Sequence, residues 1–317
     1  MRLANAALVG SRHPSKSIML GSRLLVSAIL IPAFVGLCTL DHRMGDEAWI
    51  LLALCIALAV RCCYEMCDLV RVRNLNPEWW VTSVCSISLI VCLWWGRASG
   101  QDGTGCESLL ALSKPMFAFG MIVLGLFCYE AFKFREPGRS LETMGAHFLI
   151  IVYVGLLLTF TAQLRWVAGA QAGYFTLASL VICVKLGDVG AYTFGKLWGK
   201  KKMSPILSPG KTWMGAVGAI VGSMLGATLW LQFGIRLFSS EWTPPPIQWS
   251  LCYGLVLAIA GMVGDLCESL IKRDVGQKDA AKLMPGFGGL LDLLDSILFA
   301  GPIAYLLWMI LPLSNWL

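Results

Sequence analysis

The sequence of 317 residues predicts an all-α fold: a polytopic helical bundle integral to a membrane, with about nine transmembrane helices. Composition is the first reason, because 57% of the residues are hydrophobic and only 14% are charged. A soluble domain has about 25% charged residues. The second reason is that apolar runs close to the ~20 residues needed to cross a bilayer recur along the whole chain. The alternating pattern of an outer-membrane barrel does not occur in the sequence.

Nine spans are predicted along the chain. In order, they are 23–40, 48–66, 79–96, 112–130, 145–164, 171–188, 213–235, 249–266 and 294–313. The first is expected to stay uncleaved, because it is long and lacks the small-residue cleavage site of a signal peptide. Residues 1–22 then form a cytoplasmic tail, and 23–317 form a single transmembrane domain. In the seventh span Gly218, Gly222 and Gly226 recur every four residues, which predicts close packing against another helix.

Lys and Arg are distributed unevenly between the two sides of the predicted bundle. Counted with the span ends, the N-terminal tail and the even-numbered connections hold 20 of the 25 basic residues. Cytoplasmic loops carry this excess, so we expect a protein of the inner (cytoplasmic) membrane with its N-terminus and active site facing the cytoplasm. The net charge of +6 therefore gathers on that face. Nucleic acid is not an expected partner, since no soluble domain is present to read a groove.

The sixth connection, within residues 185–213, combines basic residues with glycines and Ser-Pro turns. Its lysines are Lys196, Lys200, Lys201, Lys202 and Lys211. Glycines let a backbone approach a ligand, and lysines neutralise phosphate, which favours phosphate binding over simple attraction to anionic lipid. The segment is not a P-loop, because GAYTFGKL ends in Leu197 and SPGKT has Pro205 where the first glycine should stand.

Three aspartates lie where the last two spans meet the cytoplasm. Asp265 ends one apolar span, and Asp292 and Asp295 begin the next. Carboxylates at this depth are costly and usually functional, and three together need a cation to stay ionised. Oxygen ligands suit Mg²⁺, so we expect these three to bind it. For each of the three aspartates, the alternative is an ion pair with a neighbouring Lys or Arg. Asp188 is equally expected to be a metal ligand or a polar packing residue. Glu268 is interpreted as a helix-surface residue.

The segment that contains these acids resembles a known signature. GDLCESLIKRDVGQKDAAKLMPGFGGLLDLLDS, residues 264–296, is similar to the C-terminal motif of the phosphatidate cytidylyltransferase (CDP-diacylglycerol synthase) family, S-x-x-K-R-x4-K-D followed by P-G-H-G-G-x-L-D-R-x-D. Residues 188–213 are similar to the family's second block, an Asp, G-A-Y, a basic stretch and S-P-x-K-T-W. The matching residues of the C-terminal motif are Ser269, Lys272, Arg273, Lys278, Asp279, Pro285, Gly286, Gly288, Gly289, Asp292 and Asp295.

The resemblance implies transfer of CMP from CTP to phosphatidic acid, giving CDP-diacylglycerol and pyrophosphate, in a catalytic part at 185–300. It also implies a homodimer, a cytoplasmic polar cavity open sideways to lipid, and Mg²⁺ assisted by K⁺ as second cation. The candidate catalytic residues are Asp265, Lys272, Asp292 and Asp295. The candidate phosphate-binding residues are Lys211, Ser208, Ser269, Arg273 and Lys278.

Three positions depart from the pattern of that family. Phe287 stands in place of His, Leu293 in place of Arg, and Met214 in place of a common Glu. No acid–base role of that His and no phosphate contact of that Arg can be expected here. The aspartates and the Lys-Arg pair are unchanged, so the chemistry is expected to persist while the preferred lipid can differ.

Two other classes of protein remain open on the sequence. A CTP-dependent lipid kinase of the polyprenol type would share the bundle and the basic loops, but it would release CDP rather than pyrophosphate. A cation-coupled transporter would also carry intramembrane aspartates and glycine-broken helices. The transporter is less expected, because every candidate acid lies at the cytoplasmic helix ends.

Overall fold

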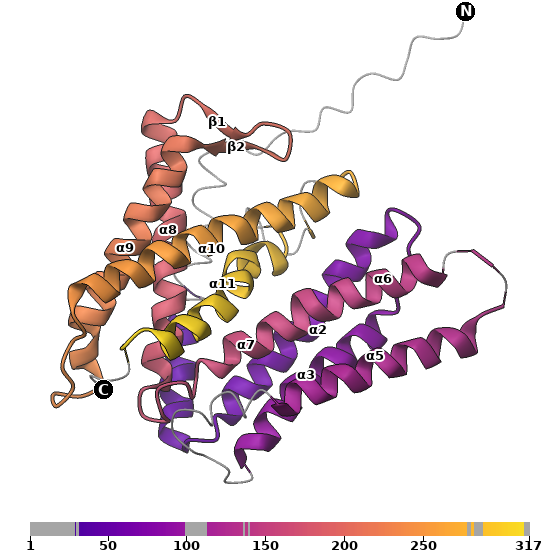
Figure 1. Cartoon of the computed structure of the whole chain (residues 1–317), viewed down its shortest axis with the longest axis horizontal. Helices are drawn as coiled ribbons and strands as arrows, with labels where there is room; N and C mark the ends of the chain where they lie inside the picture. The colour runs from indigo at the N-terminus through magenta and orange to yellow at the C-terminus, as the bar shows by residue number, and fades with distance from the viewer. Residues whose placement is uncertain are drawn as a thin grey trace, which may run out of the picture.

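A computed structural model describes residue 29 and residues 32–98, 113–135, 137–138, 140–277, 280–281 and 288–313. Residues 32–44 are helical. The helices that follow are α2 (Trp49–Arg71), α3 (Trp79–Ala98), α5 (Ser113–Lys133), α6 (Ser140–Ile150), the π-helix η1 (Ile151–Leu156), α7 (Leu157–Gln163), α8 (Gly173–Trp198), α9 (Trp213–Phe233), the 3₁₀-helix η2 (Gly234–Leu237), α10 (Ile247–Asp274) and α11 (Leu291–Ile310). Figure 1 shows them as one bundle, with the only described strands at one end.

The structure confirms the predicted all-α membrane fold. Among the described residues, seven helical segments are long and apolar enough to cross a membrane, one of which is α6, η1 and α7 in continuous succession. Trp79–Trp95 of α3 is a shorter apolar helix. The first predicted span, 23–40, lies partly outside the described residues.

The longest extensions beyond the predicted spans, toward the polar end of the bundle, are those of α8 and α10. α8 continues to Trp198 and α10 to Asp274, so Asp188 and Asp265 lie inside helices rather than at their ends. The apolar pattern ends before the helix does, because backbone hydrogen bonding continues into the polar segment. The sequence pattern therefore missed the ends of these two helices.

A small antiparallel hairpin of β1 (Lys202–Ser204) and β2 (Ser208–Thr212) connects α8 to α9. Thr212 ends β2 and caps α9, because its hydroxyl accepts a hydrogen bond of 3.0 Å from the backbone N–H of Gly215. The SPGKT segment is thus an antiparallel strand leading into a helix. A P-loop would need a parallel strand before its glycine-rich turn, which agrees with the rejection of that motif.

The even-numbered connections meet at one end of the bundle, as the charge pattern predicts. Arg73 after α2 pairs with Asp274 of α10 at 3.2 Å. The Arg273 side chain donates to the backbone oxygen of Leu207 in the hairpin at 3.3 Å, and Lys133 of α5 pairs with the carboxylate that precedes α3. Which side of a membrane this end faces stays a prediction.

α8 and α9 pack through glycines, as the four-residue repeat predicts. A side chain at Gly218 would come within 2.6 Å of Phe194 Cβ, and one at Gly222 would lie 3.0 Å from the carbonyl carbon of Leu186. These approaches leave no room for a Cβ. The glycine stripe therefore sets the spacing of the two helices that carry the hairpin.

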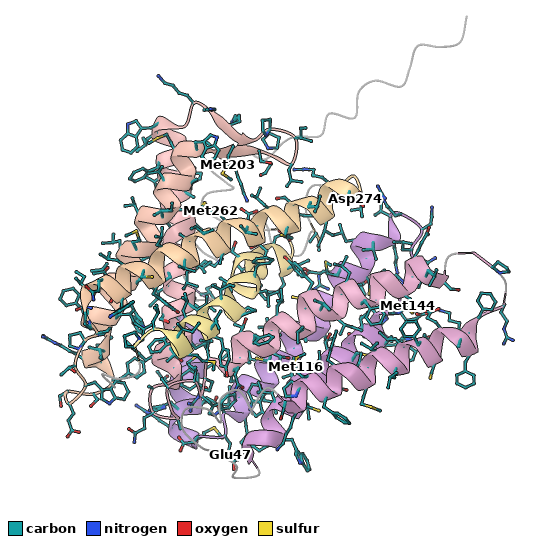
Figure 2. All side chains as sticks on the ribbon, in the orientation of Figure 1. Glu47, Met116, Met144, Met203, Met262 and Asp274 are labelled. Carbon is teal, nitrogen blue, oxygen red and sulfur yellow. The ribbon has the colours of Figure 1, made fainter. Side chains whose placement is uncertain are left out.

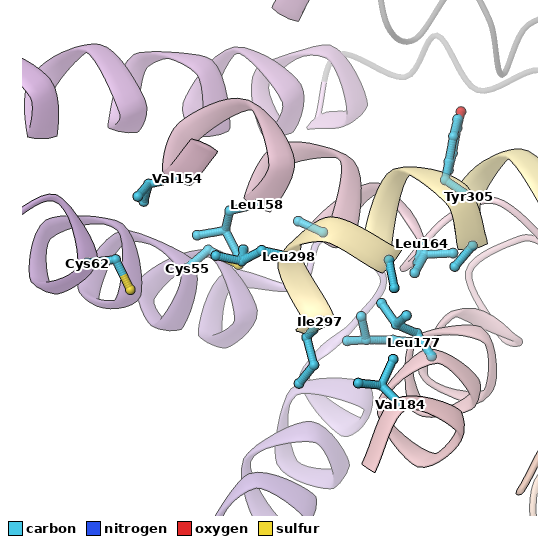
Figure 3. Packing of buried hydrophobic residues seen from close by; sticks show 14 of the residues in the cluster. Cys55, Cys62, Val154, Leu158, Leu164, Leu177, Val184, Ile297, Leu298 and Tyr305 are labelled. Carbon is cyan, nitrogen blue, oxygen red and sulfur yellow. The ribbon is translucent and has the colours of Figure 1, made fainter. Parts of the chain in front are cut away.

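The core surrounds α11, the last helix. Figure 3 shows Leu298 toward Cys55 of α2 and Leu158 of α7, while Ile297 points toward Val184 of α8. All five side chains are buried. Because α11 contacts helices from both halves of the chain, its position depends on α2 and α7 as well as on α10.

Candidate active site

Three carboxylates converge between α10 and α11. Asp265 and Glu268 lie almost one turn apart on α10, Asp295 lies on α11, and one oxygen from each falls within 4.8 Å of the others. Gly264 permits this approach, because a side chain there would lie 2.6 Å from Phe299 Cβ and 3.1 Å from the Asp295 carbonyl oxygen. We call these three residues the acidic trio. Asp265 and Asp295 were predicted to share a site, and the structure brings them together.

Glu268 is the member of the trio that the sequence analysis treated as a helix-surface residue. That interpretation is wrong, since Glu268 is only 1% exposed. The i, i+3 spacing from Asp265 puts the two carboxylates on one helix face, and this spacing was the available signal. The sequence after residue 266 is rich in charged residues, which favoured the prediction that Glu268 lies on an exposed helix face.

Lys272 joins the trio to Asp292. Its ammonium group lies 2.7 Å from Glu268 Oε2 and 2.7 Å from Asp292 Oδ1, and the three side chains are 12%, 1% and 10% exposed. An ammonium group at this distance from two carboxylates forms a charge-assisted hydrogen bond with each of them and fixes their positions. Lys272 therefore occupies the centre of the predicted site.

Asp292 is held by backbone groups rather than by the trio. Its Oδ2 accepts hydrogen bonds from the N–H groups of Gly289 at 2.6 Å and Ala280 at 3.2 Å. The turn that delivers these groups passes through Gly288, whose φ of +87° favours glycine. Among the described residues Asp292 does not belong to the group that could share one ion, and it contacts that group through Lys272.

Two further lysines border the site. Lys211 of β2 lies 2.9 Å from Asp265 Oδ2, so the hairpin contacts the trio. Lys185 of α8 lies 3.2 Å from Asp188 and donates to the Leu293 carbonyl oxygen at 3.0 Å. Asp188 thus forms an ion pair on α8 outside the trio, and Lys185 ties α8 to α11.

The trio fits a hard divalent cation. It brings three carboxylates together, and two lysines, Lys211 and Lys272, contact it directly. Because Lys272 also pairs with Asp292, the four carboxylates exceed the two lysines by two negative charges. Glu268 Oε1 is buried and has no hydrogen-bond partner among the described residues. Buried polar atoms are normally satisfied, and an oxygen-only donor set suits Mg²⁺. These three residues could therefore hold such an ion.

A cavity of about 320 Å³ opens beside Asp265, between α8, α9, α10 and the hairpin. Its charged lining residues are Asp188, Lys196, Lys211 and Asp265. Met203 of β1 and Met262 of α10, labelled in Figure 2, line it as well. Its volume lies within the range of small-molecule sites, and most of its remaining lining is glycine, alanine and aliphatic side chains.

The other predicted phosphate-binding residues lie around this end of the bundle. Ser208 is half-buried in β2, and Ser269 is buried on α10 beside Glu268. Arg273 is occupied by backbone oxygens of Leu207 and Gln277, at 3.3 and 3.1 Å. Lys278 lies outside the described residues, as does Phe287.

Glu65 of α2 supports the site from the N-terminal half, and the sequence analysis did not single it out. Its carboxylate is 1% exposed and accepts hydrogen bonds from the N–H groups of Leu290 at 3.1 Å and Leu291 at 2.9 Å. Arg61 lies 2.9 Å from the same carboxylate. A negative group at a helix N-terminus is favourable, and here it fixes the start of α11. An acid inside an apolar span was the missed signal.

We expect Glu65→Gln to lower the free energy of unfolding by about 1–3 kcal/mol, because the amide has one acceptor oxygen for two buried N–H groups. Thermal unfolding of the purified protein in detergent measures this. Glu142→Gln is the control: Glu142 is exposed in the first turn of α6, and the loss there should stay below about 1 kcal/mol. Equal unfolding of wild type and Glu65→Gln would contradict the role of Glu65.

Comparisons with known proteins show the family to which the chain belongs. A family model described as the cytidylyltransferase family matches residues 21–311. The chain is 28% identical over 287 residues to the phosphatidate cytidylyltransferase of Haemophilus influenzae, covering 90% of this chain and 96% of that one. It is 33% identical over 196 residues to the phosphatidate cytidylyltransferase of Staphylococcus epidermidis, covering 61% and 68%. It is also 29% identical to the uncharacterized protein YnbB of Escherichia coli, covering 92% and 96%. The chain belongs to the cytidylyltransferase family.

Proposed function

We propose that this protein is a phosphatidate cytidylyltransferase of phospholipid biosynthesis, which transfers CMP from CTP to phosphatidic acid. The observation that carries the proposal is the acidic trio, bordered by Lys211 and Lys272 at the polar end of a membrane bundle. Two phosphate-bearing substrates need positive charge around them, and a lipid substrate needs a site at the membrane surface. Relatives named for this activity, aligned over most of the chain, support it.

The reaction balances without a strong base. A phosphate oxygen of the lipid attacks the α-phosphorus of CTP, a new P–O bond forms, and the bond from the α-phosphorus to the bridging oxygen breaks to release pyrophosphate. The second pKa of a phosphate monoester is about 6, so the nucleophile is largely ionised near neutral pH. The family histidine that Phe287 replaces is therefore not required for deprotonation.

We assign the cation to the acidic trio and not to Asp292. When bound there, Mg²⁺ would neutralise charge on the reacting and leaving oxygens. Lys272 pairs with Glu268 and Asp292, and Lys211 pairs with Asp265, so we expect both lysines to supply positive charge to the substrate phosphates. Ser208 and Ser269 remain candidates for hydrogen bonds to phosphate, and Asp188 is a second-choice metal ligand.

The remaining assignments rest on the family resemblance and on the charge pattern. We propose a homodimer in the inner (cytoplasmic) membrane, with the end that carries the hairpin in the cytoplasm. K⁺ is proposed as a second cation beside Mg²⁺. The 20 basic residues predicted for the cytoplasmic side support the orientation.

The test is an assay of the purified protein with phosphatidic acid, labelled CTP and Mg²⁺. We expect labelled CDP-diacylglycerol and one pyrophosphate for each product, and no turnover in excess chelator. Release of CDP with a phosphorylated lipid would instead identify a CTP-dependent kinase. Cation transport into sealed vesicles without nucleotide, in the absence of any lipid product, would identify a transporter.

A further inference from the structure

The cavity beside Asp265 is elongated. Its lining residues follow one face of α8 from Cys183 to Lys196, which spans about 20 Å along the helix axis. On α10 they extend from Leu257 to Asp265, about 12 Å. Lys211 of the hairpin pairs with Asp265, so Asp265 lies between the hairpin and the middle of α10. We call the part of the cavity toward the hairpin the upper cavity, and the part toward Leu257 the lower cavity.

The two parts of the cavity differ in chemistry. The upper cavity contains the ammonium groups of Lys196 and Lys211, and the carboxylates of Asp188 and Asp265 lie near the division. The lining of the lower cavity includes Cys183, Val184, Ala219, Leu257, Ala258 and Gly261. Among the described lining residues of this part, the Cys183 thiol is the only side-chain hydrogen-bonding group, and a thiol is a weak donor.

The lower cavity suits a hydrocarbon chain better than a nucleobase. Cytosine carries an amino donor and ring acceptors, and burying such groups without partners costs free energy. An acyl chain has no polar group to satisfy. The lower cavity also runs from Asp265 toward the middle of two helices that are long and apolar enough to cross a membrane. The chains of a lipid extend in this direction when its phosphate lies at the membrane surface.

We propose that the lower cavity binds the first part of one acyl chain of the lipid substrate, while Lys196 and Lys211 face the phosphate of that lipid. A chain held there places the phosphate beside the acidic trio, and misplacement of a reacting group by about 1 Å can slow a reaction about 100-fold. Gly261 leaves room for the chain, because it has no side chain at this point of the lining. This inference rests on the proposed function, which supplies the lipid substrate.

Gly261 is the position at which the occupant can be tested. A Cβ there would lie 3.9 Å from Val184 Cγ1 of α8 and 3.8 Å from Ser296 Cβ of α11. These are ordinary van der Waals distances, so the position accepts a side chain. Because helical side chains tilt toward the N-terminus of their helix, Gly261→Leu would fill the lower cavity toward Leu257 and extend away from Asp265.

The test compares Gly261→Leu and wild type with dioleoyl and with dihexanoyl phosphatidic acid. The kcat/KM for the dioleoyl lipid should fall roughly 10- to 100-fold, because an excluded chain displaces the phosphate, and that for the dihexanoyl lipid less than about 3-fold. The KM for CTP should not change. Gly120→Leu is the matched control, since Gly120 is exposed on α5 with nothing within 4 Å of an added Cβ. It should match wild type with both lipids.

An equal fall with both lipids would overturn the inference, and so would a raised KM for CTP, because the lower cavity would then serve the nucleotide or the trio. Unchanged kinetics with the dioleoyl lipid would overturn it as well. If Gly261→Leu lowers the Tm of the ligand-free protein, Gly261→Ala takes its place. Its methyl group makes only the ordinary contacts given above, and it should give a smaller fall with the same dependence on chain length.

The rise in Tm on adding each lipid gives a readout that does not depend on turnover. In Gly261→Leu the rise with the dioleoyl lipid should shrink, while the rise with the dihexanoyl lipid should match wild type. If the wild-type protein makes no CDP-diacylglycerol, the proposed function fails, and these two rises still decide whether the lower cavity binds an acyl chain.

Discussion

The Asp295→Asn variant is expected to lose CDP-diacylglycerol synthesis by roughly 100- to 1,000-fold or more, comparable to the loss of one electrostatic group from a preorganised site. Asparagine keeps the shape of the side chain but removes one of the three negative charges that would hold the cation. The residue is 6% exposed, so solvent cannot replace that charge. Initial rates over a range of Mg²⁺ concentrations measure the effect, and the variant should need more Mg²⁺ for its residual activity.

This variant should remain folded. Without a cation the trio contains mutually repelling carboxylates, so removing one charge should leave Tm unchanged or raise it. Asp274→Asn is the matched control, because Asp274 is an exposed carboxylate at the end of α10 that pairs with Arg73, and it should keep near wild-type turnover. Full activity of Asp295→Asn with unaltered Mg²⁺ dependence would exclude the trio as the cation site.

Lys272→Met should be the most destabilising substitution in the site, with a loss of about 3–5 kcal/mol in the free energy of unfolding. The change removes the ammonium group that Glu268 and Asp292 share, and the side chains of these two acids are only 1% and 10% exposed. Methionine occupies similar space, so the loss reports charge rather than packing. Urea or thermal unfolding in detergent, without Mg²⁺, provides the measurement.

Two companions make the Lys272 result interpretable. Arg73→Met removes an ion pair at the same end whose side chains are 54% and 58% exposed, and such pairs contribute at most about 1 kcal/mol. The double variant Lys272→Met with Glu268→Gln should recover part of the stability lost by Lys272→Met, because one of the unpaired charges disappears. Unfolding of Lys272→Met at the wild-type midpoint would show that the two carboxylates are not ionised in the folded protein.

The sequence was sufficient for the features that depend on local pattern. Apolar runs located the membrane helices, the distribution of Lys and Arg grouped the connections correctly, and the glycine repeat of α9 predicted its packing on α8. Asp265 and Asp295 were recognised because an acid in an apolar helix end is costly. Each of these predictions rests on a few neighbouring residues, whose physical chemistry can be interpreted without knowledge of the fold.

What the sequence did not reveal depends on contacts between distant segments. Glu268 rather than Asp292 lies beside Asp265 and Asp295, because it follows Asp265 by three residues on α10, while the turn at Gly288 gives Asp292 backbone partners. Glu65 lies in an N-terminal helix, where no motif marks it. The hairpin was missed because three- and five-residue strands rich in Lys, Ser and Gly have little β-propensity.

The bond between Glu65 and the start of α11 joins residues 226 positions apart. A growing chain must therefore insert nearly all of its helices before the last one can dock, and loop closure over such a distance is slow. Catalytic competence should appear only when synthesis is essentially finished. A truncated or partly inserted chain would lie in the bilayer without consuming nucleotide, so activity would begin only after α11 has docked.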